Sequence, residues 1–90
     1  MKKSPWFVYI IENEKGFLYT GITTDIERRL KQHRGLLKGG AKFFHTGAPV
    51  RVMYKKKFAD RSLASKFEAL VKKLTREDKI YLIEKKRVRK

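Results

Sequence analysis

The chain has 90 residues, a length that supports a single domain built around one layered core. Its 24 lysines and arginines outnumber its 9 acidic residues, which gives a net charge of +15. A compact domain with this charge is expected to bind a polyanion, and nucleic acid is the first candidate. Cysteine is absent, which excludes disulfides, thiolate catalysis and thiolate metal sites and leaves carboxylate and histidine as metal ligands.

A membrane surface is the competing polyanion, because anionic lipid also attracts basic segments. Binding to it would require a basic amphipathic helix with a strong exposed apolar face. The apolar run at residues 6–11 is too short for the core of a signal peptide, and polar residues follow it. We therefore expect a cytoplasmic protein without a membrane partner; a peripheral membrane protein anchored by its basic C-terminus is a third hypothesis.

Two β-rich segments, residues 6–11 and 17–22, predict a β-hairpin. Both are aromatic and β-branched, and the polar segment between them contains a glycine. The two-residue period of a strand places Tyr9 and Tyr19 on the same face of this hairpin. With a three-residue loop at 13–15, Tyr9 is expected directly opposite Tyr19.

A helix and a long loop are expected next. Thr24 and Glu27 have the spacing of a capping box, and apolar residues then recur at helical spacing, which predicts a helix over about 25–36. Residues 39–49 contain three glycines and a proline, a composition that favours an irregular surface loop. A loop of this length usually has a function.

Residues 50–55 alternate between apolar and polar side chains, which predicts a third, half-buried strand. Asp60 or Ser62 can cap a second helix packed on the sheet. The predicted buried stripe of that helix has helical spacing and consists of Leu63, Phe67, Leu70, Val71 and Leu74.

Thr75 and Asp78 repeat the capping pattern, so a third helix is expected over residues 76–85. Residues 85–90 are basic at five of six positions and predict a mobile tail after a single domain of residues 1–84. The resulting order, ββα, loop, βαα, predicts an α+β fold in which helices flank a three-stranded antiparallel sheet. A concave basic site is expected where the hairpin and the first two helices meet.

Four residues of the first half of the chain suggest phosphate chemistry. Arg29 and His33 lie four residues apart on the first predicted helix, so both could reach one phosphate, Arg29 as a fixed cation and His33 as a proton carrier. Such a pair is also common on the solvated face of a basic protein. Tyr9 and Tyr19 could orient a water and take its proton if a nearby cation lowers their pKa. The alternative is that they are ordinary sheet residues with polar tips in water.

Glu68 lies beside the predicted buried stripe of the second helix, where a carboxylate is less expected than on the open face. An ion pair with Lys72, four residues further on, would explain it without any function. Ligation of a metal ion is the other explanation.

The order and spacing of these residues resemble the pattern of the GIY-YIG nuclease family. The matching positions are Val8, Tyr9 and Ile10, then Tyr19, Thr20 and Gly21, followed by Thr23, Arg29 and His33. Glu68, which follows Ala64, is similar to the family's metal-binding glutamate. The resemblance runs from about residue 6 to residue 74 and is strongest to the small stand-alone bacterial proteins of the UPF0213 type, which are also similar to the SLX-type endonuclease domain.

This resemblance implies a metal-dependent phosphodiesterase. In it, Tyr9 or Tyr19 helps to deprotonate the attacking water, Arg29 steadies the phosphate charge, and Glu68 holds one Mg²⁺ or Mn²⁺ ion. His33 would assist proton transfer or orientation. One carboxylate suffices for one ion when water and phosphate oxygens fill the remaining positions.

Two departures from the family pattern are present. Phe7 and Val8 stand where the family has glycine and isoleucine, a change of packing that leaves Tyr9 in place. The polar residue that many members carry after the last helix has no counterpart in residues 85–90. The contacts with the substrate are therefore expected to differ from those of these members.

The expected substrate is DNA, bound through its phosphates with little dependence on sequence. The phosphate contacts are expected from the tail and from Arg28, Lys38, Lys42 and His45. So short a domain leaves little room for target recognition, so a protein partner could supply target specificity. The alternative function is a non-catalytic nucleic-acid-binding module with the same fold, which could bind RNA or belong to a larger complex.

Overall fold

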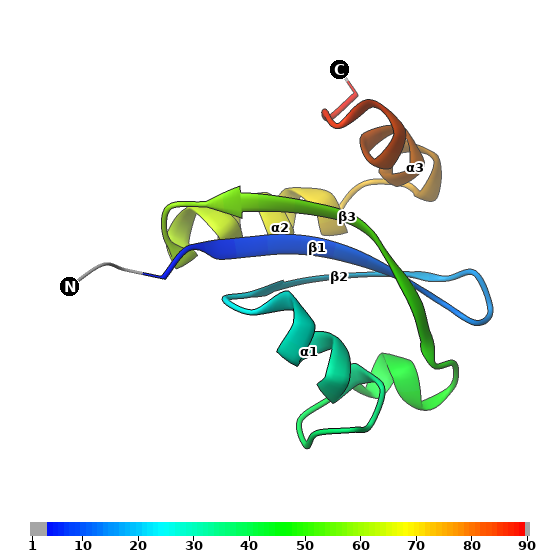
Figure 1. Cartoon of the computed structure of the whole chain (residues 1–90). Helices are drawn as coiled ribbons and strands as arrows, with labels where there is room; N and C mark the ends of the chain where they lie inside the picture. Colours follow the sequence, from blue (N-terminus) through cyan, green and yellow to red (C-terminus); the bar gives the residue numbers. More distant parts are fainter. Residues whose placement is uncertain (1–3, 90) are drawn as a thin grey trace.

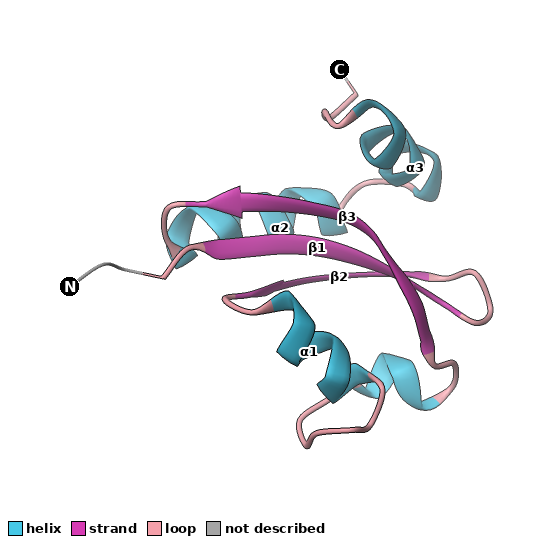
Figure 2. Cartoon of the chain, viewed as in Figure 1, coloured by secondary structure: helices cyan, strands magenta, loops and turns pink. Residues whose placement is uncertain are grey.

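The computed structural model describes residues 4–89, so the first three residues of the predicted domain and Lys90 of the predicted tail lie outside the described part. The elements follow the predicted order: β1 (Trp6–Asn13), β2 (Leu18–Thr23), α1 (Ile26–His33), the short 3-10 helix η1 (Lys42–His45), β3 (Pro49–Phe58), α2 (Arg61–Lys72) and α3 (Arg76–Lys85). The strands form one antiparallel sheet with the order β2-β1-β3 (Figure 2). The predicted fold class is therefore confirmed.

Helices lie on both sides of this sheet, and the central strand β1 supplies both cores (Figure 1). Ile10 packs with residues of α2 and α3, whereas Tyr9 and Ile11 pack with residues of α1 and η1. Because both faces of β1 are covered, its residues 8–11 are all buried and do not alternate with polar ones. The edges of the sheet are β2 and β3.

The register of the β1–β2 hairpin differs from the predicted one. Tyr9 pairs with Gly21 rather than with Tyr19. The register places the loop at residues 14–16 rather than 13–15, and this one-residue shift of the loop moves the pairing by two residues. Since the side-chain period of a strand is two, both phenols stay on the predicted face.

The buried side chain of Asn13 fixes this register. Its Oδ1 accepts hydrogen bonds from the backbone N–H groups of Lys15 (3.0 Å) and Phe17 (2.9 Å), a side-chain to backbone arrangement that holds the turn. Its backbone N–H donates to the carbonyl of Phe17 at 2.9 Å. Asn13 therefore still belongs to the strand, and the turn begins after it.

Replacement of Asn13 by alanine should lower the free energy of unfolding by about 2 kcal/mol, because two backbone donors lose their acceptor inside the hairpin. Urea unfolding followed by circular dichroism measures this difference. The neighbouring Glu14→Ala variant alters an exposed side chain and should stay within about 0.5 kcal/mol of wild type. Equal stability of both variants would show that Asn13 does not hold the turn.

Helix α1 is shorter than predicted at both ends. Its N-cap is Asp25, whose carboxylate accepts from the backbone N–H of Arg28 at 3.0 Å, so the predicted capping box of Thr24 and Glu27 is wrong. The helix ends at His33, and Gly35 follows with a φ of 81°. This early end frees the following segment to turn back over α1.

The predicted loop at 39–49 is not irregular throughout, because residues 42–45 form η1. Phe44 of η1 is buried against the residues of β1 and α1 on this face of the sheet. An aromatic pair in the loop, Phe43 and Phe44, thus anchors it to the core.

Helix α2 begins after Asp60, which accepts from the backbone N–H of Leu63 at 3.0 Å. Its buried face is rotated from the predicted one: Leu63 and Leu70 are 46% and 45% exposed, while Ala64 and Val71 are fully buried. The predicted stripe is therefore wrong at both leucines. The rotation turns the small Ala64 toward the sheet and moves Glu68, one turn further on, closer to it.

Residues 86–89 of the basic C-terminal segment lie against the domain, and the mobility of the tail stays a prediction. After the predicted cap of α3 at Thr75, which the structure confirms, the helix ends with Lys86 in a left-handed conformation. Val88 then packs on the core, and Arg89 forms an ion pair with Asp78 at 3.6 Å.

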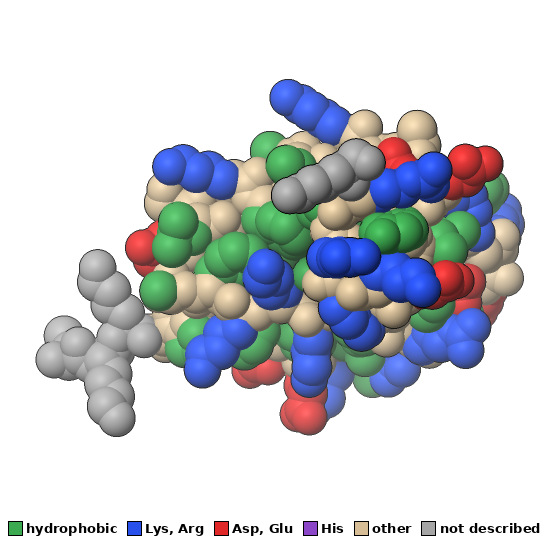
Figure 3. All heavy atoms as spheres, turned by 90° about the horizontal axis from the view of Figure 1, so that it is seen from above, with side chains coloured by type: hydrophobic (Ala, Val, Ile, Leu, Met, Phe, Trp, Pro, Cys, Tyr) green, Lys and Arg blue, Asp and Glu red, His purple; other side chains and the backbone are tan. Residues whose placement is uncertain are grey.

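Positive charge is spread widely over the molecular surface. Lysine and arginine side chains cover much of the face formed by β3 and α3, with hydrophobic side chains between them (Figure 3). Strand β3 alone contributes three consecutive exposed lysines, Lys55, Lys56 and Lys57. Within residues 4–89, every helix is too short or too polar to span a bilayer.

Candidate active site

The phenol of Tyr9 reaches from the central strand to the edge of the sheet. Its ring lies across Gly21 of β2, where an added Cβ would come within 2.5 Å of the Tyr9 Oη and 2.7 Å of its Cζ. The ring therefore occupies the space that any side chain at position 21 would need. Because β2 is an edge strand, the Tyr9 hydroxyl lies near the edge of the sheet, where it is buried.

His33 holds this hydroxyl group in place. The Tyr9 Oη lies 2.9 Å from His33 Nε2, and the backbone N–H of Ala41 donates to His33 Nδ1 at 3.2 Å. Since Nδ1 is an acceptor, the neutral ring carries its hydrogen on Nε2 and donates it to Tyr9. The hydroxyl hydrogen of Tyr9 is then available to another acceptor. The contact with Ala41 depends on Gly40, because a Cβ there would collide with the carbonyl oxygen of Gln32.

The pKa values of both groups favour their neutral forms at pH 7. Burial, reinforced by the charge of Arg29, lowers the pKa of His33 from 6.5 to about 4. Burial raises the pKa of Tyr9 to about 12, although hydrogen bonding to Arg29 opposes the shift. The ligand-free site therefore contains a neutral imidazole that donates to a neutral phenol.

A pH dependence of stability follows from His33. Its folded-state pKa lies below the unfolded value, so the unfolded chain binds the proton more readily and the stabilising contribution is present above pH 6.5. That contribution should be lost as the pH falls from 6.5 toward 4. Unfolding midpoints in urea across this range should fall more steeply for wild type than for His33→Gln. Parallel curves would contradict the buried neutral histidine.

Arg29 is tethered between its own helix and the returning loop. Its Nη1 donates to Gln32 Oε1 at 2.9 Å and to the carbonyl of Gly39 at 2.7 Å. Arg29 also lowers the pKa of the Tyr9 hydroxyl, against the larger opposite effect of burial. The predicted side-by-side placement of Arg29 and His33 is thus present, with Arg29 half-buried and His33 buried.

Tyr19 forms the rim of the site. Its ring centroid lies 6.2 Å from that of Tyr9 and 5.2 Å from that of His33. It also contacts the aromatic pair of η1, with centroid distances of 5.3 Å to Phe43 and 5.1 Å to Phe44. The half-buried phenol of Tyr19 is therefore held by rings on several sides.

Glu68 lies on α2, which packs on the opposite face of the sheet from α1 (Figure 1). The preceding residue, Phe67, packs on Phe58 of β3, with ring centroids 5.4 Å apart. Burial is the main cause of the raised pKa of Tyr9, and the charge of the Glu68 carboxylate is the smallest contribution to it. Glu68 Oε2 also lies 3.2 Å from Lys72 Nζ, so the ion pair considered above is formed.

The carboxylate of Glu68 is suited to a hard divalent ion that takes few of its ligands from the protein. The part of the chain between residues 4 and 89 has no group of three histidine or acidic side chains placed to hold a metal. Glu68 is partly accessible, with 21% of its side chain exposed. Mg²⁺ and Mn²⁺ are bound by oxygen and retain water, so one carboxylate fits when the substrate supplies phosphate oxygens.

The predicted basic tail follows α3, on the opposite side of the sheet from α1 (Figure 1). The four single residues predicted to contact phosphate lie on the α1 and η1 side of the domain. All are exposed: Arg28 on α1, Lys38 in the loop, and Lys42 and His45 in η1. Sequence reasoning missed the backbone partners of the site, the carbonyl of Gly39 and the N–H of Ala41. The adjacent glycines at 39 and 40 were the available signal, because such pairs permit close backbone approach.

The sequence profile of the GIY-YIG catalytic domain matches residues 5–87. The chain belongs to the GIY-YIG family, a family of nucleases. The five predicted site residues all fall within the matched region, although the match does not assign a role to any of them.

Its relatives are small proteins named UPF0213. The chain is 42% identical over 84 residues to UPF0213 protein SG0387 of Sodalis glossinidius, covering 92% of this chain and 76% of the relative. It is 41% identical over 80 residues to YhbQ of Escherichia coli K12, covering 89% and 78%. The solution NMR structure of UPF0213 protein BH0048 from Bacillus halodurans has 31% identity and a TM-score of 0.57, covering 89% of this chain and 83% of that one. The small single-domain GIY-YIG proteins are therefore its relatives in both sequence and fold.

Proposed function

We propose that this chain is a metal-dependent endonuclease that hydrolyses phosphodiester bonds in DNA. The observation that supports the proposal is the 2.9 Å hydrogen bond between the Tyr9 hydroxyl and His33 Nε2, with Tyr19 packed beside both rings and Arg29 on the same helix as His33. The charges of Arg29 and Glu68 both influence the pKa of Tyr9, although burial is the larger cause. Membership of a nuclease family and the net charge of +15 support the same substrate class.

Each side chain has a role in this proposal. Arg29 compensates charge on the phosphoryl oxygens, because a guanidinium stays charged and its tethers fix its position. Tyr9, neutral at pH 7, donates its hydroxyl hydrogen to a substrate oxygen. Tyr19, at the rim, orients the attacking water and is the phenol that helps to remove its proton. His33 is a positioning residue that acts through Tyr9.

A Mg²⁺ or Mn²⁺ ion held by Glu68 would supply further charge compensation and lower the pKa of a bound water. The carboxylate of Glu68 forms an ion pair with the ammonium group of Lys72. The ammonium group of Lys72 therefore competes for the ligand that the proposal assigns to the metal.

Replacement of Lys72 by methionine should lower the Mg²⁺ concentration for half-maximal cleavage by up to about fivefold, because a partly exposed ion pair contributes at most about 1 kcal/mol. A magnesium titration of DNA cleavage measures this shift. Lys73→Met removes an exposed lysine that has no ion pair within residues 4–89 and should leave the midpoint unchanged. An unchanged or higher midpoint for Lys72→Met would mean that Glu68 is not a ligand.

Cleavage of plasmid and branched DNA in magnesium tests the proposed function. Wild type should cut, whereas Glu68→Gln and Arg29→Ala should bind DNA but cut far more slowly. Equal cutting by all three proteins would indicate contamination or another site. Binding without cutting by wild type would overturn the catalytic proposal.

A non-catalytic nucleic-acid-binding module is the second candidate. The ion pair between Glu68 and Lys72 favours it, because that pair satisfies the carboxylate without a metal. In this case the basic surface would bind DNA or RNA as part of a larger complex, and cleavage would be absent under every metal condition.

A further inference from the structure

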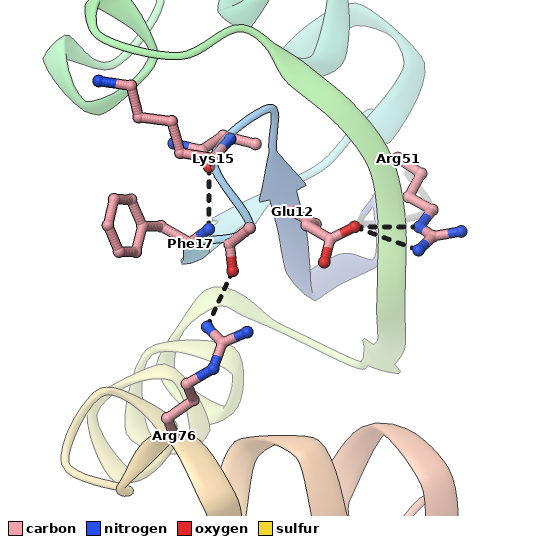
Figure 4. A network of polar contacts seen from close by, with 7 residues as sticks. Glu12, Lys15, Phe17, Arg51 and Arg76 are labelled. Carbon is pink, nitrogen blue, oxygen red and sulfur yellow. Dashed lines mark hydrogen bonds and ion pairs between the residues drawn. The ribbon is translucent and has the colours of Figure 1, made fainter.

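A hollow lined in part by aromatic side chains lies at the start of β2, beside the candidate active site. It has a volume of about 290 Å³ and is lined by Phe17, Leu18, Phe43, Arg76 and Lys79. Phe17 is 57% exposed, which is unusual for a phenylalanine. Figure 4 shows its ring pointing away from the hairpin.

Hydrogen bonds hold the backbone of the turn that carries this ring. The N–H of Phe17 donates to Asn13 Oδ1 at 2.9 Å, and Arg76 Nη1 donates to the carbonyl of Gly16 at 2.8 Å (Figure 4). The hairpin turn is therefore held from the strand side and from α3. An exposed ring on an anchored turn loses little conformational entropy when a ligand covers it.

One lining residue of the hollow also contacts the site. Phe43, which lines it, lies 5.3 Å from the ring of Tyr19. Phe17 precedes Gly21 by four residues, about 13 Å along an extended strand. A short segment of a nucleic acid strand can span that distance, so one strand can occupy the site and the hollow together.

The charges around the hollow are positive. Within residues 4–89, the charged residues that line it are Arg76 and Lys79, and the exposed Lys15 lies two residues before Phe17 in the hairpin turn. Aromatic side chains beside cations are the combination by which proteins bind unpaired nucleotides, with the base on the ring and the phosphate at the cation. In duplex DNA the bases are already stacked, and mainly the phosphates are available to such a surface.

We propose that this hollow binds an unpaired nucleotide next to the scissile bond, with its base stacked on Phe17 and its phosphate near Lys79. The ligand class is then a nucleotide whose base is unpaired. This proposal rests on the proposed function for the cleavage site, but it predicts a binding preference that does not need cleavage.

Fluorescence anisotropy with a labelled oligothymidylate and with a duplex of equal length, both without metal, tests the proposal. Phe17→Ala should weaken binding of the single strand at least fivefold, the lower end of the effect of removing one stacking side chain. Phe17→Tyr keeps a ring and should stay within about twofold of wild type. Binding of the duplex should change less than binding of the single strand.

Leu36→Ala is the matched control, because it removes another exposed apolar side chain, 69% exposed, in a different part of the surface. It should leave both affinities unchanged. An equal effect of Phe17→Ala on both DNAs, or no effect on either, would overturn the inference while leaving the proposed endonuclease intact. Failure of wild type to bind either DNA would overturn both. If Phe17→Ala does not fold, Phe17→Leu keeps an apolar side chain without a ring and should show the same selective loss.

Discussion

Replacement of Arg29 by alanine should lower the rate of DNA cleavage at saturating DNA by about 100- to 1,000-fold, the usual effect of removing one preorganised donor from a transition state. The guanidinium is tethered by Gln32 and by the carbonyl of Gly39, so it requires little reorganisation when charge develops on the phosphate. Binding of DNA should weaken much less, because many other cations contribute to it. Single-turnover cleavage and anisotropy measure the two effects separately.

Arg34→Ala provides the control for charge. Arg34 is exposed and lies at the end of the same helix, so its removal changes the net charge equally without touching the site. Its cleavage rate should stay close to that of wild type. Similar losses of rate in both variants would mean that Arg29 acts only through the overall positive charge.

The second large effect is expected at Gly21. A Cβ at this position would lie 2.5 Å from the Tyr9 Oη and 3.1 Å from Cε2 of Tyr19, so Gly21→Ala must displace both phenols. A displacement of about 1 Å in a catalytic group can lower a rate about 100-fold. Cleavage by Gly21→Ala should fall by that order, with the circular dichroism spectrum of a folded domain.

Gly47→Ala is the matched variant for this prediction. Its Cβ would come within 2.9 Å of Asn13 Nδ2, which lies outside the site. It should therefore reduce stability while keeping the cleavage rate of the folded protein. Normal cleavage by Gly21→Ala would contradict the placement of the Tyr9 hydroxyl in the reaction.

The sequence predicts the fold class well, because the two-residue and 3.6-residue periods and the cap at Thr75 are local signals. It did not predict the hairpin register. Residues 13 and 16 are both common in turns, and the choice between them depends on hydrogen bonds of the Asn13 side chain that only the folded turn shows. The predicted faces of Tyr9 and Tyr19 are still correct, because a register shift of two residues leaves each side chain on the same face of the sheet.

The apolar pattern of α2 also did not predict which face of the helix is buried. Leucines dominate any apolar stripe, but Ala64 is the residue that lies against the sheet, since a small side chain lets the helix come close. The site itself joins residues from four elements, and periodicity within an element cannot show such a juxtaposition. The family resemblance named Tyr9, Arg29 and Glu68 together. The tethers of Arg29 to Gly39 and of His33 to Ala41 depend on how the loop returns over α1.

The central claim is that the carboxylate of α2 and the phenols of the hairpin share one site at the edge of β2. Paramagnetic relaxation by Mn²⁺ in the NMR spectrum of the intact chain with bound oligonucleotide measures this directly. The ion should broaden the resonances of the Tyr9 and Tyr19 rings and of the Gly21 amide first, and Glu68→Gln should remove the effect. Broadening centred elsewhere, or unchanged by Glu68→Gln, would contradict the shared site.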